Sequence, residues 1–169
     1  MGVTTHYEGK LKSATAAADL LSRVRTFARE RGWPIDEVEA NERSLRRMVN
    51  EDPTDYVGHV VGLVVHPHED AEPLAFSVPT DFFIQDYCKT QFAGIPTHKA
   101  VIELLRVVEP LFSRLDVTDE GEFWESSDDA LLREMFAGLE EALASAIAEH
   151  PNAQVKVRLQ NGRIADVIT

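Results

Sequence analysis

The residues with the clearest potential to bind a ligand lie in one short stretch, Lys89-Thr90-Gln91, followed by His98. We expect Thr97 to cap the helix after this stretch, so that His98 lies in the first turn. Free N–H groups at a helix N-terminus, with a lysine and a hydroxyl nearby, can bind an anion. The pattern therefore predicts a site for a small acidic metabolite or a partner's carboxylate. An ordinary polar strand end before a capped helix explains the same residues.

Cys88 directly precedes this stretch and is the only cysteine of the chain. A catalytic thiol needs a base within hydrogen-bond reach, and His98 is the residue that could supply it. A lone cysteine on a strand is, however, more often a small buried apolar residue. The pattern therefore defines no catalytic residue. One cysteine cannot form an internal disulfide, so the cytoplasm is the expected compartment.

Two histidines, His66 and His68, could contribute to a metal site. They share a face of an extended chain, and imidazole with nearby carboxylates suits zinc and similar ions. Their position at a strand end, around a proline, is also that of an ordinary surface loop. A complete site would need His98 or His6 as well, so we expect no metal and no other cofactor. His66 and His68 are the candidate ligands if a metal binds.

The net charge of −12 is concentrated in one region of the chain. Residues 116–149 contain eleven acidic residues and a single base, Arg133. A field of this sign repels phosphate backbones, so we expect no nucleic-acid binding. It favours a basic protein partner or a cation, although an acidic helix face can also serve solubility alone. The expected contact residues are Asp119, Glu120, Glu122 and Trp124.

The same acidic turn can be compared with a calcium-binding loop. An EF-hand loop that begins at Asp116 would place Thr118, Glu120 and Gly121 at its third, fifth and sixth positions. Its last ligand position would be Ser127, where the site needs a bidentate glutamate. We therefore expect no EF-hand. Weak cation binding by the carboxylates of this turn stays open.

Hydrophobic periodicity and capping residues predict three amphipathic helices. Each begins at a hydroxyl side chain and ends near a glycine or a proline. The predicted helices run from Ser13 to Gly32, from Thr97 to about Pro110, and from Ser126 or Ser127 to His150.

Alternating and β-branched segments predict the strands, with the clearest one at Tyr56–His66. We also expect a short helical turn at Asp36–Glu42, a turn at Asp52–Asp55 and a terminal hairpin at Asn161-Gly162. The remaining expected strands cover residues 3–11, 44–49, 74–78, 82–87 and 115–118.

These elements predict one α+β domain over residues 1–169. Its sheet is mostly antiparallel, with a meander from about residue 44 to 88, packed by two to three amphipathic helices. The apolar runs are shorter than the roughly 20 residues of a membrane span, so we expect no membrane partner.

The expected function is that of a non-enzymatic interaction module with an acidic surface for a basic partner, as in inhibitor or immunity proteins. The alternative is a small hydrolase or transferase that depends on a divalent metal. The third helix and the terminal hairpin could also form a homodimer interface.

Overall fold

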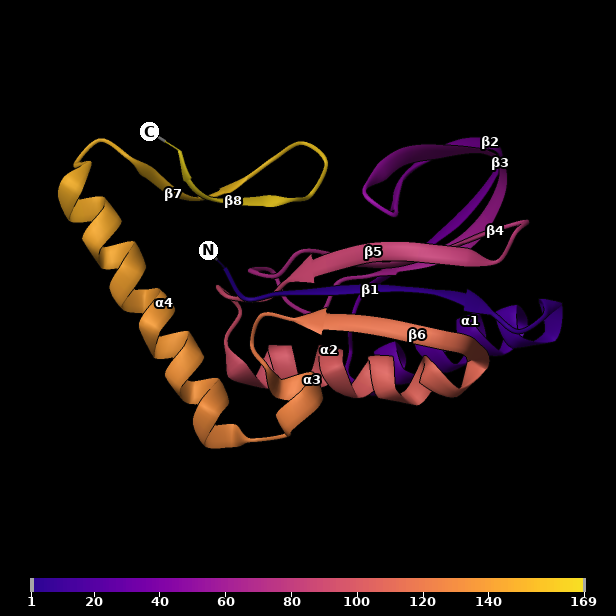
Figure 1. The fold of residues 1–169 in the computed structure, drawn as a ribbon, viewed down its shortest axis with the longest axis horizontal. Coiled ribbons are helices and arrows are strands. Elements are labelled where there is room, and N and C mark those ends of the chain that lie inside the picture. The colour runs from indigo at the N-terminus through magenta and orange to yellow at the C-terminus, as the bar shows by residue number, and fades with distance from the viewer. Residues whose placement is uncertain (1, 169) are drawn as a thin grey trace.

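The computed structural model describes residues 2–168, and the antiparallel sheet β5-β1-β6 lies at its centre (Figure 1). In this sheet β1 (Thr4–Leu11) pairs on one side with β5 (Phe83–Lys89) and on the other with β6 (Phe112–Asp119). Successive side chains of a strand point to opposite faces. Tyr7 is therefore buried on the face that the helices cover, whereas His6 is exposed on the other face.

Two helices, α1 (Ala14–Glu30) and α2 (Ile95–Val108), cover that buried face of the sheet (Figure 1). The predicted cap of α1 is confirmed, because Ser13 Oγ accepts a hydrogen bond from the Ala16 N–H at 3.1 Å. The predicted Thr97 cap of α2 is wrong. Gly94 is the N-cap, and its φ of +86° is a backbone conformation that favours glycine. Each helix buries six residues, several of which join β1 and β5 in the main apolar core.

A second antiparallel sheet contains β2 (Ile35–Val49), β3 (Asp52–Val65) and β4 (Leu74–Pro79) in that order. The predicted helical turn at Asp36–Glu42 is wrong, since β2 pairs with β3 from Ile35 to Val49 with one irregularity after Ala40. Long-range pairing here outweighs weak local preference.

The predicted turn at Asp52–Asp55 is also wrong. The chain reverses at Asn50-Glu51, where φ is +51° and +67°. Two-residue hairpin turns of type I′ have positive φ at both central positions.

The predicted α+β class is confirmed. The meander consists of β2, β3 and β4, whereas β5 crosses to pair with β1, from Phe83 opposite Lys10 to Lys89 opposite Thr4. The Tyr7 hydroxyl donates a hydrogen bond to the Ala75 carbonyl at 2.6 Å and so links β1 to β4. The two sheets therefore share one core.

The chain continues after α2 through a 3-10 turn, β6 and the short helix α3 (Phe123–Ser126) to the long helix α4 (Asp129–Glu149). The predicted serine cap of α4 is wrong, because Asp128 accepts the Ala130 and Leu131 N–H groups. The predicted hairpin is confirmed as β7 (Gln154–Arg158) and β8 (Ile164–Ile168). No helix within residues 2–168 has the length and apolar character needed to cross a bilayer.

Candidate functional site

The residues predicted as an anion site lie together, but their polar groups are directed at other parts of the chain. Lys89 Nζ lies 2.8 Å from Asp166 Oδ1 and donates to the Ile164 carbonyl at 3.0 Å. Gln91 also donates to Asp166 Oδ1, at 2.7 Å. These contacts join the end of β5 to the C-terminal hairpin.

Thr90 and His98 are fully buried and form a polar relay with Asp119. An ionised carboxylate can only accept, so His98 Nε2 donates to Asp119 Oδ2 across 3.2 Å. In the neutral ring, Nδ1 then accepts the Thr90 hydroxyl hydrogen at 2.8 Å. A hydroxyl, an imidazole and a carboxylate in this order have the connectivity of a nucleophilic triad. The Thr90 hydroxyl is sealed from solvent, however, so no substrate can reach it in this structure.

Asp119 also fixes the acidic turn. Its carboxylate accepts the N–H groups of Gly121, Phe123 and Trp124 at 2.9–3.0 Å. Burial alone would raise the pKa of Asp119, but His98 and the N–H groups of Gly121 and Trp124 hold that pKa below its usual value. A Cβ on Gly121 would lie 2.8 Å from His98 Nε2, so the turn needs glycine at this position.

The other predicted residues of the acidic turn face outward to different degrees. Glu120 and Glu122 are exposed, although one Glu120 oxygen accepts the Thr4 N–H at 2.9 Å. Trp124 is half-buried and packs against the main apolar core and against a second, smaller apolar cluster around Ile102 and Phe136. The Arg106 guanidinium lies 5.7 Å from its ring. The turn therefore presents carboxylates to solvent while its aromatic residue stabilises the fold.

The two histidines proposed as metal ligands already bond to neighbouring groups. His66 Nε2 lies 2.7 Å from Asp36 Oδ2, and His68 Nδ1 accepts the Asp70 N–H at 3.0 Å. Both line a cavity of about 420 Å³ to which His98 does not contribute. Among residues 2–168, no three or more His, Cys, Asp or Glu side chains are arranged to hold a metal ion.

The thiol considered as a nucleophile is buried. Cys88 Sγ donates to the Glu72 carbonyl at 3.2 Å, and its exposure is zero. Burial, together with the nearby negative charges of Glu72 and Asp86, raises the pKa of the Cys88 thiol far above its usual value. A thiolate nucleophile is therefore disfavoured at this position.

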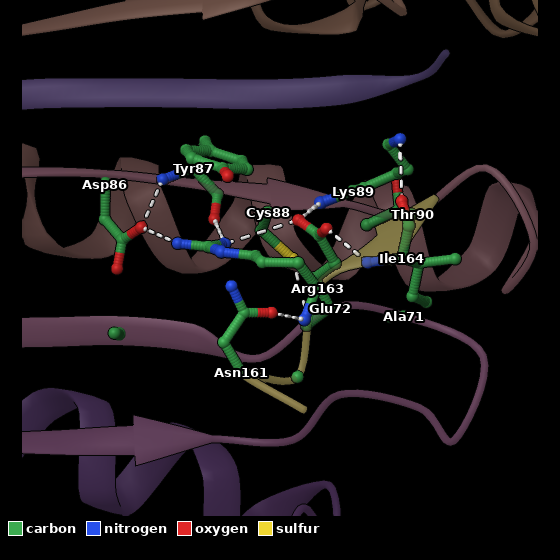
Figure 2. Close-up of polar contacts among 12 residues, drawn as sticks. Ala71, Glu72, Asp86, Tyr87, Cys88, Lys89, Thr90, Asn161, Arg163 and Ile164 are labelled. Atoms are coloured by element: carbon green, nitrogen blue, oxygen red, sulfur yellow. Dashed lines mark hydrogen bonds and ion pairs between the residues drawn. The ribbon is translucent and has the colours of Figure 1, made fainter. Parts of the chain in front are cut away.

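Sequence analysis missed a charged cluster that lies between β5 and the C-terminal hairpin (Figure 2). The buried Glu72 carboxylate accepts the N–H groups of Lys89 and Ile164, and Arg163 lies 3.3 Å from it. Arg163 also pairs with Asp86, and its guanidinium lies 3.7 Å from the centre of the Tyr87 ring. Glu72 and Arg163 are 91 positions apart, so no local pattern could pair them.

Two ionisable groups beside this cluster, Asp86 and Tyr7, have raised pKa values. Burial raises the pKa of Asp86, although the positive charge of Arg163 acts in the opposite direction. Burial likewise raises the pKa of Tyr7 on the neighbouring strand. Perturbed groups of this kind often mark functional regions, although structural ion-pair networks produce them too.

A groove of about 740 Å³ lies beside the cluster, over the sheet face that the helices leave open. Its floor comes from β5, β1 and β6. One wall is the end of β2, and the other is the hairpin turn with Asn161 and Arg163. Figure 1 shows the β2–β3 and β7–β8 hairpins on this side of the sheet, opposite α1 and α2.

The second candidate surface is the outer side of α3 and α4. Of the 21 residues of α4, Leu132 and Phe136 are the two that are buried. The surrounding carboxylates are exposed, and eight of them have no salt bridge with a residue that the structure describes. They are Glu120, Glu122, Glu125, Asp128, Glu134, Glu140, Glu141 and Glu149.

Comparison with known proteins identifies no relative: no family model, no curated protein and no solved structure matches the chain.

Proposed function

We propose that the protein is a non-enzymatic interaction module whose α3–α4 surface binds a basic partner. The observation that carries this proposal is the combination of eight exposed carboxylates that form no salt bridge with described residues and a long helix with two buried residues. A helix in water gains most of its stability from packing an apolar face. α4 uses little of its apolar face within the described chain, which leaves it available to a partner.

The apolar face of α4 supports the same proposal. Leu139 and Leu143 recur at helical spacing and are half-buried, and Ile147 is 42 % exposed. Glu140 lies beside this stripe, one turn of the helix from Leu143 and two from Ile147. An apolar stripe bordered by carboxylates complements a basic amphipathic segment. The fitting partner is therefore a protein that presents lysine or arginine beside apolar side chains.

Charge also bears on self-association. Residues 116–149 carry eleven acids and one base, so two copies of this surface repel each other. A homodimer through α4 is therefore less favourable than a complex with a basic protein. The free thiol of Cys88 supports a proposed location in the cytoplasm.

The test uses a synthetic amphipathic helical peptide of lysine and leucine as probe, with a glutamate–leucine peptide as its control. We expect the basic peptide to bind with an affinity that falls as salt rises. The double substitution Glu134→Lys and Glu141→Lys should weaken binding at least about tenfold, because reversed charges oppose the probe.

The matched control reverses two carboxylates elsewhere. Glu39 and Glu42 are exposed on β2, and Glu39→Lys with Glu42→Lys changes the net charge by the same amount. Binding by this control should stay close to that of the unchanged protein. Equal weakening in both variants would mean that the overall charge, and not the α4 surface, attracts the peptide, and the proposal would be abandoned.

A further inference from the structure

The floor of the groove over the open sheet face is built from two rows of side chains. The register of the sheet places residues of β5, β1 and β6 directly beside one another, and alternate residues share this face. The side chains of the first row carry two rings and a hydroxyl, and those of the second row carry an amide and two carboxylates. The rows are Tyr87, His6 and Thr118, followed by Gln85, Glu8 and Asp116.

Both walls of the groove are fixed by polar contacts. The Gln85 side-chain amide acts as a strand partner for Met48, accepting its N–H at 2.8 Å and donating to its carbonyl at 2.7 Å. Arg47 makes two hydrogen bonds to Asp81, at 2.7 and 3.0 Å. Arg163 holds the opposite wall (Figure 2). The groove is therefore formed before any ligand binds, which lowers the entropic cost of binding.

Several polar groups that line the groove are not used by the fold. The Arg46 guanidinium and the Tyr87 and Thr118 hydroxyls make no hydrogen bond to another residue in 2–168, and neither does the His6 ring. Asn161 uses its carbonyl oxygen to accept the Arg163 N–H, so its amide hydrogens are free to donate. Such groups on a preformed groove of this size are typical of a ligand site.

The charges around the groove indicate a neutral ligand. The lining contains three carboxylates and three guanidinium groups, from Glu8, Asp86, Asp116, Arg46, Arg47 and Arg163. The net charge of −12 further opposes an anion, and the Arg46 guanidinium, which pairs with no residue in 2–168, opposes a cation.

The floor selects the shape and the hydrogen-bonding groups of that ligand. The rings of His6 and Tyr87 lie 5.4 Å apart and are tilted by 32° to each other, and both are exposed on the groove floor, where they can contact a ligand ring. The neighbouring carboxylates keep free lone pairs, and carboxylates commonly bind adjacent hydroxyls of a sugar ring. We infer that the groove binds a small uncharged ring molecule with adjacent hydroxyl groups, whether a nucleoside or a short saccharide.

The test follows backbone amide resonances during titration with adenosine, 2′-deoxyadenosine or maltose. Saturable shifts of the His6, Tyr87 and Thr118 resonances are expected with adenosine, with maltose or with both. The probe that binds shows whether the ligand is a nucleoside or a saccharide. If adenosine binds, its deoxy form should bind about tenfold more weakly, since it lacks one of the adjacent hydroxyls. No response to any probe at 10 mM, about ten-thousandfold above a micromolar Kd, overturns the inference. Equal binding of the two nucleosides also overturns it.

Substitutions on the groove floor supply the second readout. Thr118→Val should weaken binding about fivefold, and Thr118→Trp should abolish it by filling the groove. Thr15→Val is the control, because Thr15 is exposed on α1, beneath the opposite face of the sheet. Thermal melts establish that each variant is folded. Unchanged binding by folded Thr118→Trp protein contradicts the inference.

Discussion

Helices α1 and α2 and helix α4 form by the same periodicity, yet they are stabilised in different ways. α1 and α2 each bury six residues in 17 and 14 positions, whereas α4 buries two in 21. The C-terminal hairpin that follows α4 is held mainly by charged groups, among them Arg163, Lys89 and Asp166. Helix α4 therefore packs loosely and is anchored at its ends, which suits it to contact a partner. This difference from α1 and α2 supports the interaction proposal.

The largest expected contrast is between two leucine truncations. Leu105 is fully buried on α2, so Leu105→Ala should lower the free energy of unfolding by about 2–5 kcal/mol. Leu143 is half-buried on α4, so Leu143→Ala should lower it by less than about 1 kcal/mol. Urea denaturation measures both values. Equal losses would show that α4 is as firmly packed as the core.

The next effect concerns the anchor of the hairpin. Glu72→Ala leaves the Arg163 charge and the Ile164 N–H without their buried acceptor, with an expected loss of about 2–3 kcal/mol. Hydrogen exchange should accelerate in β7 and β8 and stay slow in α1 and α2. Glu69→Ala is the control, since Glu69 has an exposed side chain in the same loop. Uniform acceleration across the protein would contradict a local anchor.

A smaller effect is expected from acid at the Asp119 relay. The folded-state pKa of Asp119 is lowered, so its contribution is present above its usual pKa of about 4 and is lost as pH falls through the folded value. Asp119→Asn should reduce stability by about 1–2 kcal/mol at pH 7 and flatten the pH dependence below about pH 4. Urea midpoints from pH 3 to 7 test this. An unaltered pH profile in the variant would assign the acid sensitivity to other carboxylates.

The smallest effect is expected from the charge reversals on α4. Glu134 and Glu141 are exposed and form no salt bridge with described residues, so Glu134→Lys with Glu141→Lys should change stability by less than about 0.5 kcal/mol. A thermal melt checks this expectation. A large loss of stability would mean that these carboxylates stabilise the fold. Weaker binding by the variant could then result from partial unfolding.

The sequence was informative where local chemistry decides structure. The Ser13 cap, the apolar periodicity of the helices and the Asn161-Gly162 hairpin all predicted elements correctly. It was misleading in the first half of β2, where a helical turn was predicted at Asp36–Glu42. Pairing with β3 makes this segment a strand. The pairing partners of this segment, such as Val64 opposite Asp36, lie outside the short stretch from which the helical turn was predicted.

The candidate sites show the same limit. The sequence brought Thr90 and His98 together as ligand-binding residues, and they do lie in contact, but inside the protein. Asp119 was expected on the surface, yet its side chain accepts three N–H groups of its own turn. The groove could not be predicted, because it arises where β1, β2 and the terminal hairpin meet.

Hydrogen exchange of α4 in the presence of the basic probe peptide tests the proposed function most directly. In the free protein, amides in the second half of α4 should exchange faster than those of α1 and α2, since their side chains are less buried. The lysine–leucine peptide should slow their exchange, and the glutamate–leucine peptide should not. Equal protection by both peptides, or none by the basic one, would contradict the proposal that the α3–α4 surface binds a basic partner.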